Sequence, residues 1–294
     1  MKLWRVPVLA VPWCWLLVFL VAPLAIVVGI SFAQPADGIP PYAPVLAWHD
    51  GWPILSLDPA NYAVLLQDRF YLAALLRSVV VAGLSSLACL LLGYPMALAI
   101  ARAPAAWRSR LLLLVILPFW TGFLLRVTAW IGLLRDDGWI NGALLAVGLI
   151  HAPLRLLYTD FAMYVGIVYA YLPFMILPLY ARLSKLDPAL EAAAGDLGES
   201  PVGVFLRVTW PLSRPGVLAG MMLVFIPAVG EYVIPELLGG PGAQTIGRVL
   251  WTEFFDNHDW PMASAVAVAL LGVLLVPAAL LQRSGSRRFD DRGA

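Results

Sequence analysis

Two carboxylates interrupt a long apolar stretch of the chain, and their surroundings favour a role in handling charge. Glu231 and Glu236 lie in PAVGEYVIPELLGG, where two prolines and a glycine weaken a helix. Broken helices at membrane depth are tolerated where they line a cavity. An ionisable side chain at the centre of a membrane helix costs at least about 2.5–3.5 kcal/mol. The pattern makes Glu231 a candidate for a group that meets a cation, and the structural alternatives are an ion pair with Arg126 or contact with lipid headgroups.

Aromatic side chains are available to complete a path for a cation. The faces of Tyr and Trp attract ammonium groups by about 0.5–2 kcal/mol. Tyr164 and Tyr171 are seven residues apart, so they share one face of a helix. The same residue types are also common anchors at membrane interfaces. The candidate path residues are Glu231, Tyr232, Glu236, Trp120, Tyr164, Tyr169 and Tyr171.

The residues usual in catalysis and metal binding form no recognisable pattern. The three histidines lie far apart in the sequence, and the two cysteines have no metal-ligand spacing. The only lysines are Lys2 and Lys185, and neither belongs to the G-x-x-x-x-G-K-S/T phosphate-binding loop. We therefore expect no active site, no metal and no bound cofactor in this chain.

The composition is that of a membrane protein. Of 294 residues 62% are hydrophobic and 13% charged, whereas a soluble domain is about 25% charged. A helix needs about 20 apolar residues to cross a bilayer. The apolar runs predict an all-α integral membrane protein with six transmembrane helices, at residues 11–32, 72–100, 111–134, 161–183, 217–238 and 262–281. The shorter run 140–150 predicts a re-entrant or interfacial helix.

The distribution of basic residues predicts the orientation. Thirteen of the nineteen Lys and Arg residues fall in one alternating set of loops, at residues 1–10, 101–110, 182–216 and 282–294. The positive-inside rule places this set in the cytoplasm. We expect a cytoplasmic N-terminus at residues 1–10, a membrane domain at residues 11–281 and a cytoplasmic tail at residues 282–294. The opposite loops and span ends hold twelve acids, which favours a cationic cargo or a binding partner with a basic rim.

The cytoplasmic segment 187–211 predicts two short helices. Asp187 and Pro188 are suited to the cap and first position of a helix, and Gly198 to its end. Ser200 and Pro201 repeat the start signal, and we expect the second helix to end at Trp210–Pro211. Apolar residues that should lie on the membrane domain are Leu190, Ala194, Leu197, Val202, Phe205 and Leu206.

The remaining face of the first helix is small and acidic. It contains Ala192, Ala193 and Gly195 together with Glu191 and Asp196. Helices that rest on lipid favour Lys and Arg on the polar face. An amphipathic hairpin on the membrane surface is the alternative, but the acids favour a protein partner that approaches closely.

This segment resembles the EAA loop of permease subunits of binding-protein-dependent ABC importers. The family pattern is E-A-A, three residues, G, nine residues, then I-x-L-P. Here Gly198 is followed by nine residues and then by Val208-Thr209-Trp210-Pro211. The family's glutamate falls on Ala192, whereas the sequence has Glu191, which moves the carboxylate about 100° around the helix. The resemblance implies these ATPase-coupling residues: Asp187, Glu191, Ala192, Ala193, Gly195, Asp196, Gly198 and Pro211.

Three further stretches, at residues 117–141, 164–188 and 225–255, are similar to permease subunits of putrescine and spermidine importers, the putrescine type most of all. The likeness covers about residues 60–280. It implies a bacterial inner-membrane complex of two permeases, two cytoplasmic ATPases that bind ATP and Mg, and a periplasmic polyamine-binding protein. Because six spans make one half of a pathway, we expect a heterodimer with a homologous permease, with a homodimer as the alternative.

Two other functions remain open at this point. Importers of iron, sulfate or phosphonates share the EAA loop. A secondary transporter or channel that works without ATP would also be helical and apolar, but it would leave the cytoplasmic hairpin unexplained.

Overall fold

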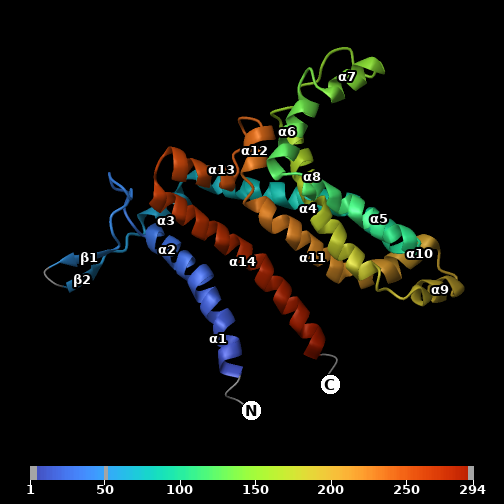
Figure 1. Ribbon diagram of the computed structural model, residues 1–294, viewed down its shortest axis with the longest axis horizontal. Helices are drawn as coiled ribbons and strands as arrows, with labels where there is room; N and C mark the ends of the chain where they lie inside the picture. Colours follow the sequence, from blue (N-terminus) through green and yellow to red (C-terminus); the bar gives the residue numbers. More distant parts are fainter. Residues whose placement is uncertain (1–4, 50–51, 291–294) are drawn as a thin grey trace. The chain divides into compact units, whose positions relative to one another are not determined.

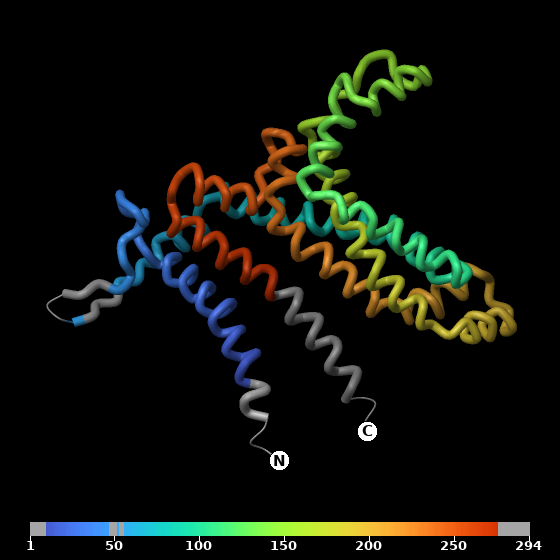
Figure 2. The backbone as a smooth tube through the Cα atoms, viewed as in Figure 1, coloured from blue at the N-terminus to red at the C-terminus, as the bar shows by residue number. Residues whose placement is uncertain are grey.

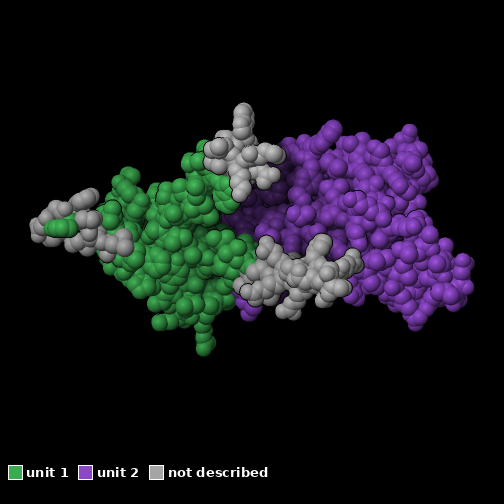
Figure 3. All heavy atoms as spheres, turned by 90° about the horizontal axis from the view of Figure 1, so that it is seen from below, with its two compact units in different colours: residues 1–75, 246–294 green, residues 76–245 purple. Residues whose placement is uncertain are grey.

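The computed structural model describes residues 5–49 and 52–290, whose regular elements are helices apart from one short hairpin of two strands (Figure 1). Lys2, Asp50 and Arg292, counted above for orientation and charge, lie outside the described residues. The chain divides into two compact units, residues 1–75 with 246–294 and residues 76–245 (Figure 3). Helix α4 begins in the first unit and continues through the second.

The first unit is formed by the N-terminal and C-terminal parts of the chain. Its core contains Leu65, Ala74, Ile246, Val249 and Val266. Strand β1 pairs antiparallel with β2, with Leu46 opposite Leu55. Helix α14 contacts α2 and α3. The elements are α1 (Arg5–Leu16), η1 (Leu17–Val21), α2 (Ala22–Ser31), β1 (Leu46–His49), β2 (Trp52–Leu55), α3 (Ala60–Gln67), α13 (Ile246–Trp251), η4 (Thr252–Asp256) and α14 (Trp260–Asp290).

The second unit is built around the closely packed pair α8 and α11. A Cβ atom on Gly220 would lie 2.7 Å from Met175 Sδ, and one on Gly216 would lie 2.8 Å from Arg182 Cβ, so glycine permits this approach. In Figure 1, α7 and α9 lie at separate ends of the unit. The elements are α4 (Arg69–Arg102), α5 (Ala105–Ile116), η2 (Leu117–Trp120), α6 (Phe123–Leu134), α7 (Trp139–Ala146), α8 (Asp160–Leu183), α9 (Pro188–Asp196), α10 (Pro201–Val204), η3 (Phe205–Thr209), α11 (Trp210–Val229) and α12 (Val233–Leu238).

The all-helical membrane class is confirmed, and the described residues contain four or five candidate spans. Four described helices are long and apolar enough to cross a membrane: Ala10–Ser31, Arg69–Arg102, Asp160–Leu183 and Pro201–Val229. A fifth exists if the pair Ala105–Trp120 and Phe123–Ala146, bent by 89°, is one span. The sixth predicted span, residues 262–281, lies within α14, of which Trp260–Leu275 is described as an apolar helix.

The bend in the third predicted span has a local cause. Pro118 has no backbone N–H, and the chain is extended at Thr121 and Gly122. Arg126 Nη1 donates to the carbonyl oxygens of Pro118 at 2.6 Å and Thr121 at 2.9 Å. The guanidinium therefore satisfies carbonyls that a straight helix would have bonded internally.

The predicted helix end at Trp210–Pro211 is wrong. The helix runs from Pro201 to Val229 through a π turn, η3, in which the N–H of Trp210 reaches the carbonyl of Phe205. Pro211 occupies one of the first two positions of α11, where a missing N–H costs little. The helix breaks instead at Gly230, as the weakened sequence around Glu231 predicts.

Candidate functional site

Helices α9 and α10 follow one another as a hairpin (Figure 2), and α9 starts at Pro188 and α10 at Pro201, as the sequence predicts. The Asp187 carboxylate accepts the N–H of Ala189 at 2.9 Å, and the Ser200 hydroxyl accepts that of Gly203 at 3.1 Å. Gly198 has φ +89°, a left-handed conformation that favours glycine. Both capping signals and the stop signal are confirmed.

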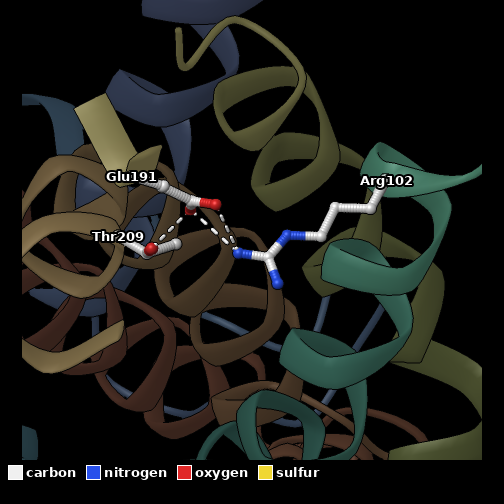
Figure 4. A network of polar contacts seen from close by, with 3 residues as sticks. All are labelled: Arg102, Glu191 and Thr209. Atoms are coloured by element: carbon white, nitrogen blue, oxygen red, sulfur yellow. Dashed lines mark hydrogen bonds and ion pairs between the residues drawn. The ribbon is translucent and has the colours of Figure 1, made fainter. Parts of the chain in front are cut away.

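Glu191 points from α9 towards the helices of the membrane domain (Figure 4). Its two carboxylate oxygens accept from Arg102 Nη2 at 2.9 and 2.8 Å, and Oε1 also accepts from the Thr209 hydroxyl at 2.6 Å. The Glu191 side chain is 28% exposed and that of Arg102 is 55% exposed. The carboxylate thus joins α9 to the end of α4 and to η3.

This environment keeps Glu191 charged. Partial burial opposes ionisation, but the hydrogen bonds from Thr209 and Arg102 and the charge of Arg102 outweigh it, so the pKa of Glu191 lies below its ordinary value. The stabilisation is present at neutral pH and is lost as the pH falls through this lowered pKa.

The outward face of α9 is small, as predicted, but it excludes Glu191. Ala192, Ala193, Gly195 and Asp196 are exposed, and nothing lies within 4 Å of a Cβ atom placed on Gly195. Placing Glu191 on this face was wrong, because its carboxylate turns inward to Arg102.

The predicted packing of the hairpin's apolar residues is wrong at four positions. Leu190, Leu197, Val202 and Leu206 are 49, 87, 66 and 56% exposed. Ala194 is half-buried, and Phe205 is half-buried with its ring centroid 5.5 Å from that of Tyr94. On α9 the inward contact of Glu191 with Arg102 leaves the neighbouring Leu190 exposed.

Glu231 is buried, with 8% of its surface exposed. It accepts the hydroxyl of Tyr171, and its Oε1 accepts the N–H groups of Val233 at 3.0 Å and Ile234 at 3.3 Å. Glu231 thereby caps the start of α12. The alternative of an ion pair with Arg126 is wrong, because Arg126 bonds to the carbonyls at the bend and lies over the ring of Phe119 at 4.9 Å.

The other candidate path residues do not all gather around this carboxylate. Tyr171 is in direct contact with Glu231, and Tyr232 is its half-buried chain neighbour. Tyr169 packs against Trp130 with ring centroids 5.4 Å apart. Trp120 is 76% exposed, Tyr164 is half-buried on α8, and Glu236 is exposed on α12.

The sequence reasoning did not single out Glu253, Arg102 or Thr209. Glu253 is 9% exposed and accepts the Tyr71 hydroxyl and Asn257 Nδ2, each at 2.8 Å. The hydrogen bond from Tyr71 to Glu253 in the first unit resembles the one from Tyr171 to Glu231 in the second. The position of Arg102 directly after a long apolar run could have indicated a charged group at the end of a membrane helix. Within the described residues, no three His, Cys, Asp or Glu side chains gather into a metal site.

The helices long enough to cross a membrane are those of an integral membrane protein. Residues 7–289 match the family model described as "Binding-protein-dependent transport system inner membrane component". The chain belongs to this family, so it is a multi-pass inner-membrane transport component and not an enzyme. Membership implies an ATPase and a periplasmic binding protein as partners.

Curated relatives agree with this family, and a solved structure shares the fold. The spermidine/putrescine transport system permease protein PotB of Escherichia coli (strain K12) is 38% identical over 265 residues, 89% of this chain and 92% of the relative. PotB of Haemophilus influenzae is also 38% identical, covering 89% and 87%. The crystal structure of a bacterial ABC transporter that imports alginate has a chain with TM-score 0.65 and 20% identity, covering 95% of this chain and 96% of that one. This last likeness shows the fold.

Proposed function

We propose that this chain is the transmembrane permease subunit of an ATP-driven importer that moves polyamines, with putrescine as the substrate, from periplasm to cytoplasm. The observation that carries the proposal is the 38% identity to spermidine/putrescine permeases over 89% of the chain. Support comes from Glu231, a buried carboxylate beside the Tyr171 ring at a break between two helices. A carboxylate and an aromatic face are groups that attract an ammonium ion.

We further propose that the ATPase docks on the outward face of α9, within residues 187–198. Ala192, Ala193 and Gly195 allow another backbone to approach closely, and Asp196 supplies a charge on the same exposed side. ATP and Mg are held by that partner, and this chain binds no cofactor. Both termini lie in the cytoplasm, on the side of the hairpin, as the distribution of Lys and Arg indicates.

The second permease in the complex is a homologous chain, so the membrane part is a pseudo-symmetric heterodimer. Alternating access commonly rocks one bundle against another around a shared site. The mass of the purified complex distinguishes the arrangements, because two identical copies of this chain would show a homodimer.

A second candidate substrate comes from a more distant relative. The probable molybdenum ABC transporter permease protein HVO_B0370 of Haloferax volcanii is 30% identical over 238 residues, 81% of this chain. An importer of such a solute would use the same fold and hairpin, but its anionic cargo would not suit a buried carboxylate.

Uptake by membrane vesicles tests the proposed function. We expect uptake of labelled putrescine that requires ATP, is blocked by vanadate and is reduced by excess spermidine but not by molybdate. Uptake that continues in the presence of vanadate would indicate a transporter that works without ATP. Vanadate-sensitive uptake of molybdate alone would support the second candidate.

A further inference from the structure

Glu191 makes contacts that an outward-facing coupling residue would not make. It lies one position before Ala192, about 100° around α9, and there it meets Arg102 and Thr209 (Figure 4). Arg102 is the last residue of α4, and Thr209 lies in the π turn that continues into α11. One carboxylate therefore connects α9 to both of these long helices.

The helices that receive these contacts are themselves joined firmly. Arg182 Nε of α8 donates to the carbonyl of Leu212 at 2.9 Å. The hydroxyls of Tyr94 on α4 and Ser213 on α11 are 2.9 Å apart. The close approach at Gly216 and Gly220 adds backbone packing between α8 and α11. Arg102 and Thr209 thus belong to one packed body.

The attachment of α9 to this body depends little on apolar contact. Leu190 and Leu197 are 49 and 87% exposed, and the described residues of α9 include none that is buried. A cavity of about 460 Å³, lined in part by Arg102, Asp187, Glu191 and Thr209, separates the start of α9 from the helices behind it. The hydrogen-bonded carboxylate bridges this space.

We propose that Glu191 is a positioning residue that fastens the coupling helix to the membrane domain through Arg102 and Thr209. The acidic group left for the ATPase is Asp196, which lies four residues after Ala192 on the same exposed face. The one-residue shift of the glutamate thus separates two functions: Glu191 holds α9 from behind, and Asp196 faces the partner. This inference rests on the proposed docking of the ATPase on α9.

Through these contacts, a movement of α9 is transmitted to the membrane helices. When the ATPase displaces the coupling helix, the Glu191 carboxylate pulls on the end of α4 and on η3 together. Charge-assisted hydrogen bonds are stronger than neutral ones, so this connection resists separation. Without it, α9 can move with the ATPase while the membrane helices stay in place.

The test compares Glu191→Gln and Asp196→Asn in the whole purified complex, reconstituted with its ATPase, second permease and binding protein. We expect Glu191→Gln to keep the ATPase bound while putrescine transported per ATP falls at least about tenfold. Asp196→Asn should instead weaken co-purification of the ATPase. The exchanged pair Glu191→Arg with Arg102→Glu should restore transport per ATP to within about twofold of wild type.

Glu199→Gln is the matched control, because it breaks the ion pair with Arg207 inside the hairpin and leaves the connection to α4 intact. Its transport per ATP should equal that of wild type. Normal coupling in Glu191→Gln overturns the inference, and so does loss of the ATPase from that variant without rescue by the exchanged pair. Failure of the wild-type complex to bind an ATPase or to move putrescine would instead count against the proposed function.

Discussion

Replacing Glu231 by glutamine separates the structural role of this carboxylate from its proposed role in transport. Glutamine keeps an oxygen that can accept the N–H groups of Val233 and Ile234, so α12 remains capped. The change removes the negative charge and weakens the contact with the Tyr171 hydroxyl. The substitution should therefore lower the free energy of unfolding only slightly, while uptake should fall strongly.

The two effects differ in size. Loss of a good helix cap costs about 1 kcal/mol, which bounds the effect on stability because the glutamine retains part of the cap. A hydrogen bond to a charged group is worth roughly 1.5–3 kcal/mol. At about 1.4 kcal/mol per tenfold, loss of that bond with an ammonium group lowers uptake about 10- to 100-fold.

The assay is uptake of labelled putrescine, normalised to folded protein measured by size-exclusion chromatography. Glu253→Gln is the matched control, since this glutamate is also buried and also accepts a tyrosine hydroxyl. It should lose stability and keep its uptake per folded complex. Tyr171→Phe leaves the Glu231 charge in place, so its uptake should fall less than that of Glu231→Gln. Normal uptake per folded complex in Glu231→Gln would refute the reasoning and remove Glu231 from the path.

Three further outcomes follow from the packing. Ala193→Trp on the outward face of α9 should prevent close approach of the ATPase, so the ATPase no longer co-purifies; normal binding and transport would show that it docks elsewhere. Gly220→Val should lower the free energy of unfolding by about 1–3 kcal/mol, because a Cβ atom there would lie 2.7 Å from Met175 Sδ. Gly83→Val is the control and should not lower it, because nothing lies within 4 Å of a Cβ atom at that position. Arg126→Gln should lower stability and leave uptake per folded complex unchanged, because Arg126 bonds to the carbonyls of Pro118 and Thr121; a specific loss of uptake would contradict this structural role.

Local signals predicted the hairpin well. Asp187 and Ser200 cap their helices, and Gly198 turns the chain, because each of these interactions involves residues at most three positions apart or a single backbone conformation. The apolar runs likewise indicated membrane helices, because hydropathy along a helix needs no knowledge of its neighbours.

Contacts between distant residues could not be predicted in the same way. Glu191 and Arg102 are 89 positions apart, and helical periodicity alone assigned the glutamate to the outer face with its small neighbours. Tyr171 and Glu231 are 60 positions apart, and an ion pair with Arg126 was equally compatible with the sequence. The proline at position 211 looked like a helix end, because a π turn that accommodates it has no sequence signal of its own.

Reconstitution into liposomes tests the central claim most directly. The purified complex of this chain with its second permease, ATPase and binding protein should accumulate labelled putrescine in proportion to ATP hydrolysed. Omission of this chain should abolish uptake. Accumulation of putrescine without ATP would contradict the assignment as an ATP-driven permease, and ATP-driven uptake of another solute with none of putrescine or spermidine would contradict the assignment to polyamines.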